Sequence, residues 1–445
     1  MSALLYRIKI SLYISNFKPM TMENINRRKF IAGTAALSAF TILKPSTVFG
    51  TSANSAIRMG IIGCGNRGTA VISDMVNHTG ARIFAMADLF GYQLENTLPG
   101  FNELNLKNDG MKIDPSKIFR GSRAYLELLN DPEVDAVLVS SPAYTHPDFL
   151  EAAVDAGKHV YCEKPVAPDV AGCKQVIRAG QNAEGKVSVA IGFQIRHATP
   201  YIEMAERIRR GDIGEVVNVQ LYYISSGSGE KQPPGNSPEE FMIRNHFHFR
   251  ELSGGILLDQ GIHMIDVCNW VLNEKPVIAL GMGNRKGEPD FGDTFTNYQV
   301  IYGYPHERNV SLHSTQFGPK FNDVCARFIG TKGVAEAHYS RGVYIEGDNP
   351  WDSGVVKGEP TEQQRAAGAF TSALYDSTSN KVKAFIQSIE SGNLINEAYS
   401  GATSTLSAIL GRTSATSKEE TTWDEMYYSN QKYDLKLNLE QFDNF

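Results

Sequence analysis

One stretch near the start of the chain, residues 57–88, constrains the fold more than any other. A short apolar run at 59–62 predicts a buried strand, and the segment Gly-Cys-Gly-Asn-Arg-Gly follows it at 63–68. Apolar residues then recur at helical spacing, and a second apolar run ends in Asp88, 20 residues after Gly68. Strand, glycine turn, helix, strand and acid in this order predict a dinucleotide-binding unit; the alternative is a purely structural glycine turn.

Each glycine of this segment has a separate predicted role. Gly63 permits the tight turn, Gly65 lets the backbone approach a pyrophosphate, and Gly68 lets the helix pack closely on the strand. The pyrophosphate would lie on free N–H groups at the helix N-terminus, beside Asn66 and Arg67, where the helix dipole favours negative charge.

Asp88 is expected to select the cofactor. A carboxylate at the end of the second strand can accept a hydrogen bond from the ribose 2′-OH, and it repels a 2′-phosphate. NAD is therefore favoured over NADP, although a guanidinium at Arg67 could reach a phosphate. The alternative is a solvated aspartate at a strand end.

Residues 1–56 are expected to be a leader and linker outside the fold. Asn-Arg-Arg-Lys-Phe-Ile at 26–31 matches a twin-arginine signal, and the mostly apolar run at 30–43 is too short for an ordinary transmembrane helix. The alternative is a buried N-terminal helix. Because the twin-arginine export machinery carries folded proteins, we expect a periplasmic or otherwise exported enzyme that retains its cofactor.

The composition argues against several other partners. It is that of an ordinary globular protein, with 42% hydrophobic and 21% charged residues. A net charge of −6 gives no indication of a nucleic-acid partner, and no later segment is apolar enough to span a membrane, so we expect no membrane partner for the mature protein. The five cysteines are scattered without a C-x-x-C pair, so we expect no metal site.

Strands and helices alternate over 57–192, which predicts an α/β fold with an N-terminal Rossmann domain, a doubly wound parallel sheet. Further strands are predicted at 136–140 and 159–162, with a helix at 147–156 between them. Ligands in such sheets bind beyond the carboxyl ends of the strands, where Ser141 and Lys164 lie. The polar segment at 99–120 is predicted to be an irregular surface insertion.

Three motifs resemble one protein family. The run THPDFLEAAVDAGKHVYCEKPVA at 145–167 is similar to the hallmark segment of the glucose–fructose oxidoreductase / inositol dehydrogenase / MocA family. GGILLDQGIHMID at 254–266 resembles its second motif, and LGRTSA near residue 412 resembles its closing helix. The resemblance covers about 57–412 and implies an NAD(P)-dependent oxidoreductase with a carbohydrate substrate.

Hydride transfer from an alcohol needs a base for the hydroxyl proton and groups that hold the carbinol carbon against the nicotinamide. Lys164 follows a strand and precedes a proline, so its amine should project into the crevice; a surface lysine is the alternative. Asp259 and His263 are four residues apart on a helix predicted at 256–272, so they share a face. The alternative is a local pair that only ties down the helix start.

By the resemblance, Lys164 and His263 handle the proton and Asp259 orients the substrate, while the choice of base between the first two stays open. Other residues at strand ends or in the family motif are expected to contact the cofactor: Ser141, Pro142, His146, Glu163, Lys164 and Gln194. For His146, the alternative is a residue that only begins a helix. The predicted substrate contacts are Arg196, Arg244, His246, His248, Asp259 and His263; for 244–250 an exposed strand is the alternative.

Residues 193–415 are predicted to form an α+β domain with a large, mostly antiparallel sheet, followed by a C-terminal arm at 416–445. Its strands are expected at 216–224, 277–283, 294–302, 309–316 and 325–329. Helices at 381–389 and 402–410 should return to the first domain, and 349–370 should be a surface excursion. In the family the open face of this sheet often joins subunits, so we expect a homo-oligomer.

Two reactions fit these motifs. The first is an NAD(P)-dependent oxidoreductase that acts on a hydroxyl of a sugar, glycoside or cyclitol. The second is a glycosidase that uses bound NAD for transient oxidation, elimination, hydration and re-reduction. Both need the same hydride site. The intact Glu163-Lys164-Pro165 motif favours the first, because the exported glycosidases of the related family do not keep it.

Overall fold

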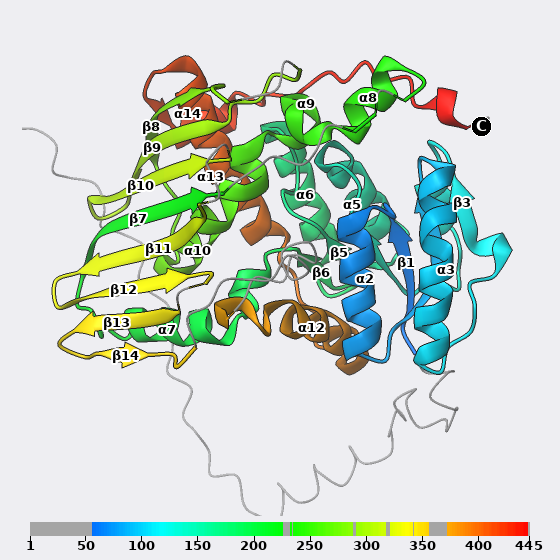
Figure 1. The fold of residues 1–445 in the computed structure, drawn as a ribbon, viewed down its shortest axis with the longest axis horizontal. Coiled ribbons are helices and arrows are strands. Elements are labelled where there is room, and N and C mark those ends of the chain that lie inside the picture. Colours follow the sequence, from blue (N-terminus) through cyan, green and yellow to red (C-terminus); the bar gives the residue numbers. More distant parts are fainter. Residues whose placement is uncertain are drawn as a thin grey trace, which may run out of the picture. The chain divides into compact units, whose positions relative to one another are not determined.

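A computed structural model describes residues 56–225, 232–233, 235–287, 291–316, 321–340, 342–355 and 372–443. Within these residues, the first sheet has six parallel strands in the order β3-β2-β1-β4-β5-β6 (Figure 1). They are β1 (Arg58–Ile62), β2 (Arg82–Asp88), β3 (Ile118–Arg120), β4 (Ala136–Val139), β5 (His159–Cys162) and β6 (Val189–Ile191). The strand order reverses between β1 and β4, which is where open α/β sheets bind their ligands. The predicted Rossmann sheet is confirmed.

Apolar side chains cover both faces of this sheet, as expected for parallel strands that are packed between helices. In β4, Ala136 and Leu138 belong to one apolar cluster, whereas Val137 and Val139 belong to the other. The helices of this part of the chain are α2 (Asn66–His78), α3 (Gly91–Lys107), α4 (Ala124–Leu129), α5 (His146–Asp155) and α6 (Val170–Ala183).

Helix α3 continues through Pro99 to Lys107, so the predicted irregular insertion is wrong over this stretch. The proline removes one backbone donor, but tertiary contacts hold the helix on both sides of it. Leu94 and Phe101 are buried in the apolar cluster on one face of the first sheet. The Asn105 amide donates to the carbonyl of Ile83 at 2.8 Å and accepts from its N–H at 3.1 Å. These contacts outweigh the local helix-breaking signal.

The second sheet has nine strands among the described residues, in the order β14-β13-β12-β11-β7-β10-β9-β8-β15. Only β7 and β10 pair in parallel within that part of the chain, so the predicted mostly antiparallel sheet is confirmed. The strands are β7 (Val216–Ile224), β8 (Ile278–Asn284), β9 (Asn297–Tyr304), β10 (Arg308–Thr315), β11 (Asp323–Gly330), β12 (Gly333–His338), β13 (Val343–Gly347), β14 (Trp351–Asp352) and β15 (Thr421–Thr422). The last four were not predicted.

Two C-terminal helices return to the first part of the chain, as predicted. Helix α12 (Ser377–Ser391) lies beside α2 (Figure 1), and Phe385 belongs to the same apolar cluster as Ile72. Helix α13 (Ala398–Ser417) carries Arg412, whose guanidinium donates to the carbonyls of Pro168 at 2.9 Å and Gly254 at 3.0 Å. One side chain thus links the loop between β5 and α6 of the Rossmann part to the turn that begins the second family motif.

The other helices of the second part are α7 (Thr199–Arg209), α8 (Pro238–Arg244), α9 (Arg250–Ser253), α10 (Ile262–Leu272) and α14 (Trp423–Tyr428). All but the last residue of the predicted leader, and residues 356–370 of the predicted excursion, lie outside the described residues. In the part that is described, no helix is long and apolar enough to span a membrane.

Candidate active site

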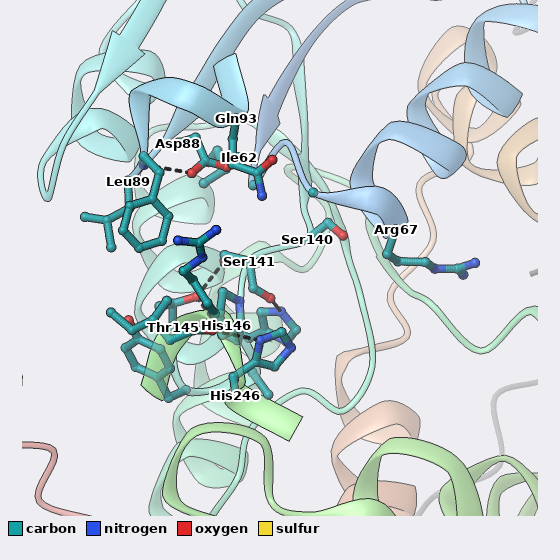
Figure 2. A pocket seen from close by; sticks show the side chains of 18 of the residues that line it. Ile62, Arg67, Asp88, Leu89, Gln93, Ser140, Ser141, Thr145, His146 and His246 are labelled. Carbon is teal, nitrogen blue, oxygen red and sulfur yellow. Dashed lines mark hydrogen bonds between the residues drawn. The ribbon is translucent and has the colours of Figure 1, made fainter. Parts of the chain in front are cut away.

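A cavity of about 860 Å³ lies beyond the carboxyl ends of β1, β2, β4 and β5, and residues from both parts of the chain line it (Figure 2). Most of the predicted site residues line it: Gly63, Gly65, Asn66, Arg67, Asp88, Ser141, Pro142, His146, Glu163, Lys164, Arg244, His246, His248 and Asp259. Gly68, Gln194, Arg196 and His263 are not among the described residues that line it. Figure 2 shows Asp88 and Leu89 at one end, and His146 and His246 at the other.

The glycine turn between β1 and α2 has the geometry that the sequence predicted. Gly63 has a φ of +94°, and a Cβ there would lie 2.6 Å from the backbone nitrogen of Ser141. A Cβ on Gly68 would lie 2.2 Å from the Gly63 carbonyl oxygen, so the helix and the turn are in direct contact. A Cβ on Gly65 would meet no described atom within 4 Å, so this position opens onto the cavity.

Helix α2 begins at Asn66, directly after Gly65, and no side chain of the described residues caps it. Its first turn also contains no acidic residue. The first N–H groups of a helix point along its axis and lack partners within the helix. The geometry therefore offers an anion-binding position beside Gly65.

Asp88 ends β2 and faces the cavity. One carboxylate oxygen accepts from the Cys64 N–H at 2.7 Å and the other from the Phe90 N–H at 2.9 Å. Burial raises the pKa of Asp88 from 3.8 to about 6, against these backbone hydrogen bonds, which lower it. The side chain is thus held in place and is mostly ionised at neutral pH.

The Arg67 side chain is held by Glu163 and Gln194. Its guanidinium donates to Glu163 at 3.0 Å and to the side-chain oxygen of Gln194 at 2.8 Å. Figure 2 shows the side chain extending away from Asp88 and Leu89. Glu163 and Gln194 therefore orient the first turn of α2, and in this arrangement Arg67 does not lie beside the carboxylate that would meet a ribose.

Lys164 and Asp259 bring the two family motifs together. The Lys164 amine lies 3.1 Å from a carboxylate oxygen of Asp259 and 2.5 Å from its backbone carbonyl oxygen. The predicted regular helix over 256–272 is wrong at its start, because residues Leu257–Gly261 form a π-helical turn before α10 begins at Ile262. Single π-turns inside helices are frequent at functional sites. Here the turn carries the carboxylate that meets the amine.

His263 lies next to this pair but outside the cavity lining. Its ring stacks on Tyr223 with centroids 6.2 Å apart and meets Phe193 edge-on at 6.4 Å. Its Nδ1 atom is buried with no hydrogen-bond partner among the described residues. Burial, with the charges of Lys164 and Arg67, places the pKa of His263 well below its usual value, so the ring is neutral at pH 7. Asp259 is paired with Lys164, and within the described part of the chain no hydrogen bond joins Asp259 to His263.

Three other histidines, His146, His246 and His248, line the cavity. His146 begins α5, and its ring nitrogens lie 2.7 Å from the Pro165 carbonyl oxygen and 2.8 Å from that of Ser141, so it joins the ends of two strands. His246 and His248 lie in a 3₁₀ turn after α8, which rules out the alternative of an exposed strand. Burial lowers the pKa of His246.

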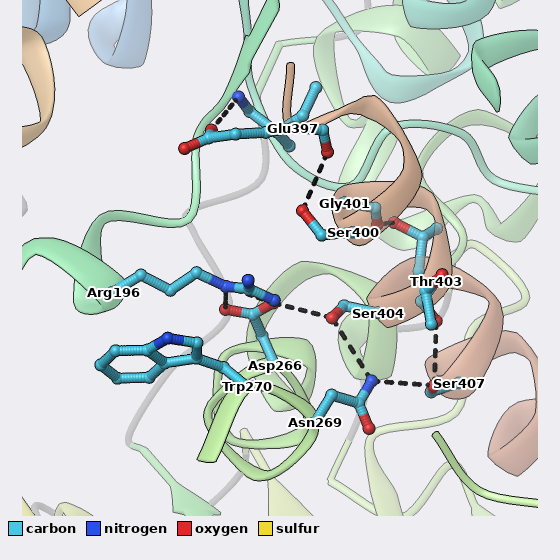
Figure 3. Close-up of polar contacts among 12 residues, drawn as sticks. Arg196, Asp266, Asn269, Trp270, Glu397, Ser400, Gly401, Thr403, Ser404 and Ser407 are labelled. Carbon is cyan, nitrogen blue, oxygen red and sulfur yellow. Dashed lines mark hydrogen bonds and ion pairs between the residues drawn. The ribbon is translucent and has the colours of Figure 1, made fainter. Parts of the chain in front are cut away.

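The Arg196 side chain forms an ion pair outside the cavity lining. Its guanidinium makes a two-pronged pair with Asp266, at 2.7 Å and 2.9 Å, and Asp266 also accepts from the Ser404 hydroxyl at 2.7 Å (Figure 3). Asp266 is 1% exposed, so this pair is part of the packing between α10 and α13. The predicted contact of Arg196 with substrate gains no support from this placement.

Several lining residues were not predicted from the sequence. Leu89 and Phe90 directly follow Asp88, so their place after the strand was the available signal. Leu439 comes from the C-terminal arm, where Phe442 packs edge-on against Phe90 with ring centroids 5.2 Å apart. The carboxylate of Asp443 accepts from the Ser122 N–H at 2.6 Å and from its hydroxyl at 2.9 Å. No local pattern predicts that this arm reaches the cavity.

The arrangement can perform acid–base chemistry beside a bound anion. A primary amine and a carboxylate line the cavity, the neutral His263 imidazole lies near them outside the lining, and a helix N-terminus faces the cavity from the glycine turn. An amine or an imidazole can exchange a proton with a substrate hydroxyl, and a carboxylate can hold a neighbouring hydroxyl.

Comparisons with known proteins identify one family for both parts of the chain. A model of an oxidoreductase family with an NAD-binding Rossmann fold matches residues 57–191, and a model of the C-terminal domain of the same GFO/IDH/MocA family matches 201–336. Together the two models cover more than half of the chain.

Among curated proteins, myo-inositol 2-dehydrogenase of Thermotoga maritima is 26% identical over 372 residues, covering 82% of this chain and 97% of that protein. Inositol 2-dehydrogenase 2 of Saccharopolyspora erythraea is 29% identical over 245 residues, which span 54% of this chain and only 61% of that relative. Among solved structures, scyllo-inositol dehydrogenase of Lactobacillus casei, with bound NAD(H) and scyllo-inositol, superposes with a TM-score of 0.63 at 19% identity over 83% of this chain and 99% of that one.

Proposed function

We propose that this chain, which belongs to the GFO/IDH/MocA oxidoreductase family, transfers a hydride between a tightly bound NAD and a hydroxyl of a cyclitol or sugar. One observation carries the proposal: the Lys164–Asp259 pair lines the same cavity as the open Gly65 position. The cavity therefore contains both an acid–base pair, Lys164 and Asp259, and the predicted pyrophosphate site.

The residues present fit a dinucleotide. Gly65 leaves room for a pyrophosphate, the N-terminus of α2 supplies donors for it, and Asp88 stands at the end of β2 to accept from a ribose hydroxyl. When bound, the nicotinamide supplies the hydride acceptor or donor. The protein supplies orientation and the proton path.

Lys164 and His263 are the proton-handling residues in this proposal. In alcohol oxidation, the substrate hydroxyl proton passes to a neutral amine or imidazole as the hydride leaves the carbon. Asp259 holds the Lys164 amine and can accept from a neighbouring hydroxyl, which fixes the reacting carbon. His263 is neutral at pH 7, so it can accept a proton directly or receive one from Lys164.

NAD is proposed over NADP. A 2′-phosphate would bring negative charge to the largely ionised Asp88, and the nearest predicted cation for it, Arg67, is bound to Glu163 and Gln194 instead. The cyclitol or sugar class follows from the names of the relatives, several of which are inositol dehydrogenases. The NAD-using glycosidase remains the competing reaction, because it needs the same hydride site.

Export and self-association are proposed as well. The twin-arginine pattern at 26–31 supports export of the loaded enzyme by the twin-arginine machinery, to the periplasm or another external compartment. The second sheet carries exposed apolar residues on β8 and β9, with Leu280 52%, Met282 68% and Ile301 57% exposed. Burial of these side chains against a second copy of the chain would produce a homo-oligomer.

The deciding experiment uses the purified mature protein. Its nucleotide is released with denaturant and identified, and the native protein is then incubated with cyclitols, free sugars and aryl glycosides. Formation of reduced nicotinamide without release of the aglycone supports the dehydrogenase. Release of the aglycone with no net reduction supports the glycosidase, and absence of both, in a protein that takes up no nucleotide, contradicts the proposal.

Variants at Lys164 and His263 test the assigned roles. Lys164→Ala and His263→Ala should each lower turnover by about 10²-fold or more, because each removes a proton-handling group. Nucleotide content should stay near that of the native chain. Lys186→Ala, at an exposed lysine in the turn that follows α6, is the matched control and should keep full activity. Near-normal turnover in either test variant removes that residue from the mechanism.

A further inference from the structure

We propose that Cys325, Glu336 and His338 form a binding site for a zinc-type divalent cation on the second sheet. This Cys–Glu–His cluster is separate from the cavity, because none of its members lines it. One ligand atom from each residue lies within 4.8 Å of the others. The proposal is independent of the hydride chemistry and opposes the expectation of no metal, which rested on the spacing of the cysteines alone.

The register of two antiparallel strands assembles the cluster. Cys325 on β11 is directly opposite His338 on β12, and Arg327 is opposite Glu336. Side chains alternate between the two faces of a strand, so Glu336 and His338, two residues apart, lie on one face. Cys325 is 1% and His338 6% exposed, so thiol and imidazole are both withdrawn from solvent. Regular strand geometry therefore holds three metal-ligand side chains together in a sheltered position.

The distances suit a small cation. The Cys325 Sγ lies 3.5 Å from the His338 Nε2, and that nitrogen lies 2.8 Å from a carboxylate oxygen of Glu336. Zinc binds sulfur at about 2.3 Å and nitrogen at about 2.0–2.1 Å, so tetrahedral geometry places these two ligand atoms about 3.5 Å apart. The sulfur–nitrogen pair already has this spacing. The same geometry places a ligating nitrogen and oxygen about 3.4 Å apart, so the carboxylate oxygen, now 2.8 Å from the imidazole, has to move away by about 0.6 Å.

The residues around the cluster orient its ligands. The Tyr344 hydroxyl donates to Glu336 at 2.7 Å, and Arg327 donates to the other carboxylate oxygen at 2.5 Å. On the other side of the imidazole, an oxygen of Asp323 lies 3.8 Å from the His338 Nδ1. That oxygen is buried and has no hydrogen-bond partner among the described residues. A carboxylate behind a ligating histidine is the usual outer partner at metal sites, where it fixes the ring.

The charges around a bound cation also balance. Once the thiol has lost its proton to the metal, Cys325, Glu336 and Asp323 supply three negative charges. A divalent cation and the guanidinium of Arg327 supply three positive charges. A sulfur, a nitrogen and a carboxylate oxygen are ligands that zinc accepts, and three protein ligands leave its fourth position for water.

The test uses the tag-free full-length protein, stripped with a chelator and titrated with Zn²⁺ against a chromophoric competitor. We expect one tightly bound zinc per chain, and an increase in Tm when it binds, because a cation that prefers the folded state stabilises it. Replacement by Co²⁺ should produce a thiolate-to-cobalt absorption band, which reports the Cys325 ligand directly.

Variants separate the site from nonspecific binding. Cys325→Ser and His338→Gln should weaken zinc binding by about 100-fold or more, and Asp323→Asn by about 10-fold, since it only orients the imidazole. Cys173→Ser, at a buried cysteine in α6, is the matched control and should bind like the native chain. Absence of chelator-resistant zinc from the folded native protein, absence of the cobalt band, or unchanged binding in Cys325→Ser would each overturn the proposal.

Discussion

The separate roles of Gly65 and Gly68 can be tested by a pair of alanine substitutions. Gly65→Ala adds a methyl group where no described atom lies within 4 Å, and the backbone φ of −71° is one that alanine adopts readily. Gly68→Ala adds the same group 2.2 Å from the carbonyl oxygen of Gly63. The first change should therefore affect the ligand, and the second should affect the fold.

The magnitudes follow from these contacts. A clash with fixed backbone costs about 3 kcal/mol, and the better helix propensity of alanine returns about 1 kcal/mol, so Gly68→Ala should lose about 2 kcal/mol. For a folded part of this size, that corresponds to a fall in Tm of roughly 2–3 °C. Gly65→Ala should change stability by no more than about 1 kcal/mol, since only the N-cap preference is affected.

Nucleotide binding should respond in the opposite order. A methyl group on Gly65 holds the pyrophosphate away from the N–H groups of α2, and loss of a charge-assisted hydrogen bond costs about 1.5–3 kcal/mol. The dissociation constant for NAD should increase by roughly 10- to 150-fold. Thermal unfolding of the nucleotide-free proteins and calorimetric titration with NAD measure the two effects. Normal NAD affinity in a folded Gly65→Ala protein would refute the placement of the pyrophosphate.

Three further predictions concern other parts of the structure. Asp266→Ala should destabilise the protein by about 2–3 kcal/mol, because it leaves the partly exposed Arg196 guanidinium without its partner, while KM stays unchanged if Arg196 has no substrate contact; thermal unfolding and steady-state kinetics test both. Asp443→Ala should speed the dissociation of bound NAD several-fold by releasing the arm from Ser122, and an unchanged rate would show that the arm is not a closure. Because the pKa of Asp88 is about 6, its charge is lost as pH falls from 8 to 5; the preference for NAD over NADP should narrow over that range, and a constant preference in equilibrium titrations would contradict the role of this charge.

Local sequence patterns predicted the strands and helices in which the buried apolar residues recur at regular spacing. The strand at 216–224 and the parallel strands of the first sheet were found because apolar residues alternate or run without interruption. Strands β12 and β13 were missed, since alanine and glycine weaken the alternation at 333–338 and the five-residue β13 is too short for a clear period. Helix α3 beyond Pro99 was missed because its packing, which a local pattern does not contain, outweighs the proline.

Site residues that belong to a local motif were predicted from the sequence. Contacts that depend on how distant segments pack together were not. Lys164 and Asp259 lie in separate family motifs, and their contact confirms that the two motifs meet. The pairing of Arg196 with Asp266 depends on how the α10 helix packs, which spacing alone does not indicate. The same holds for the Cys–Glu–His cluster, whose members meet only through the register of β11 and β12.

The proposed hydride transfer depends most directly on where a bound dinucleotide lies, and a crystal structure of the protein with NAD measures this. We expect the pyrophosphate over Gly65 and the N-terminus of α2, the adenosine ribose within hydrogen-bond distance of Asp88, and the nicotinamide ring beside the Lys164 amine. A nicotinamide ring that lies away from Lys164 and Asp259, or crystals that take up no NAD at saturating concentration, would contradict it.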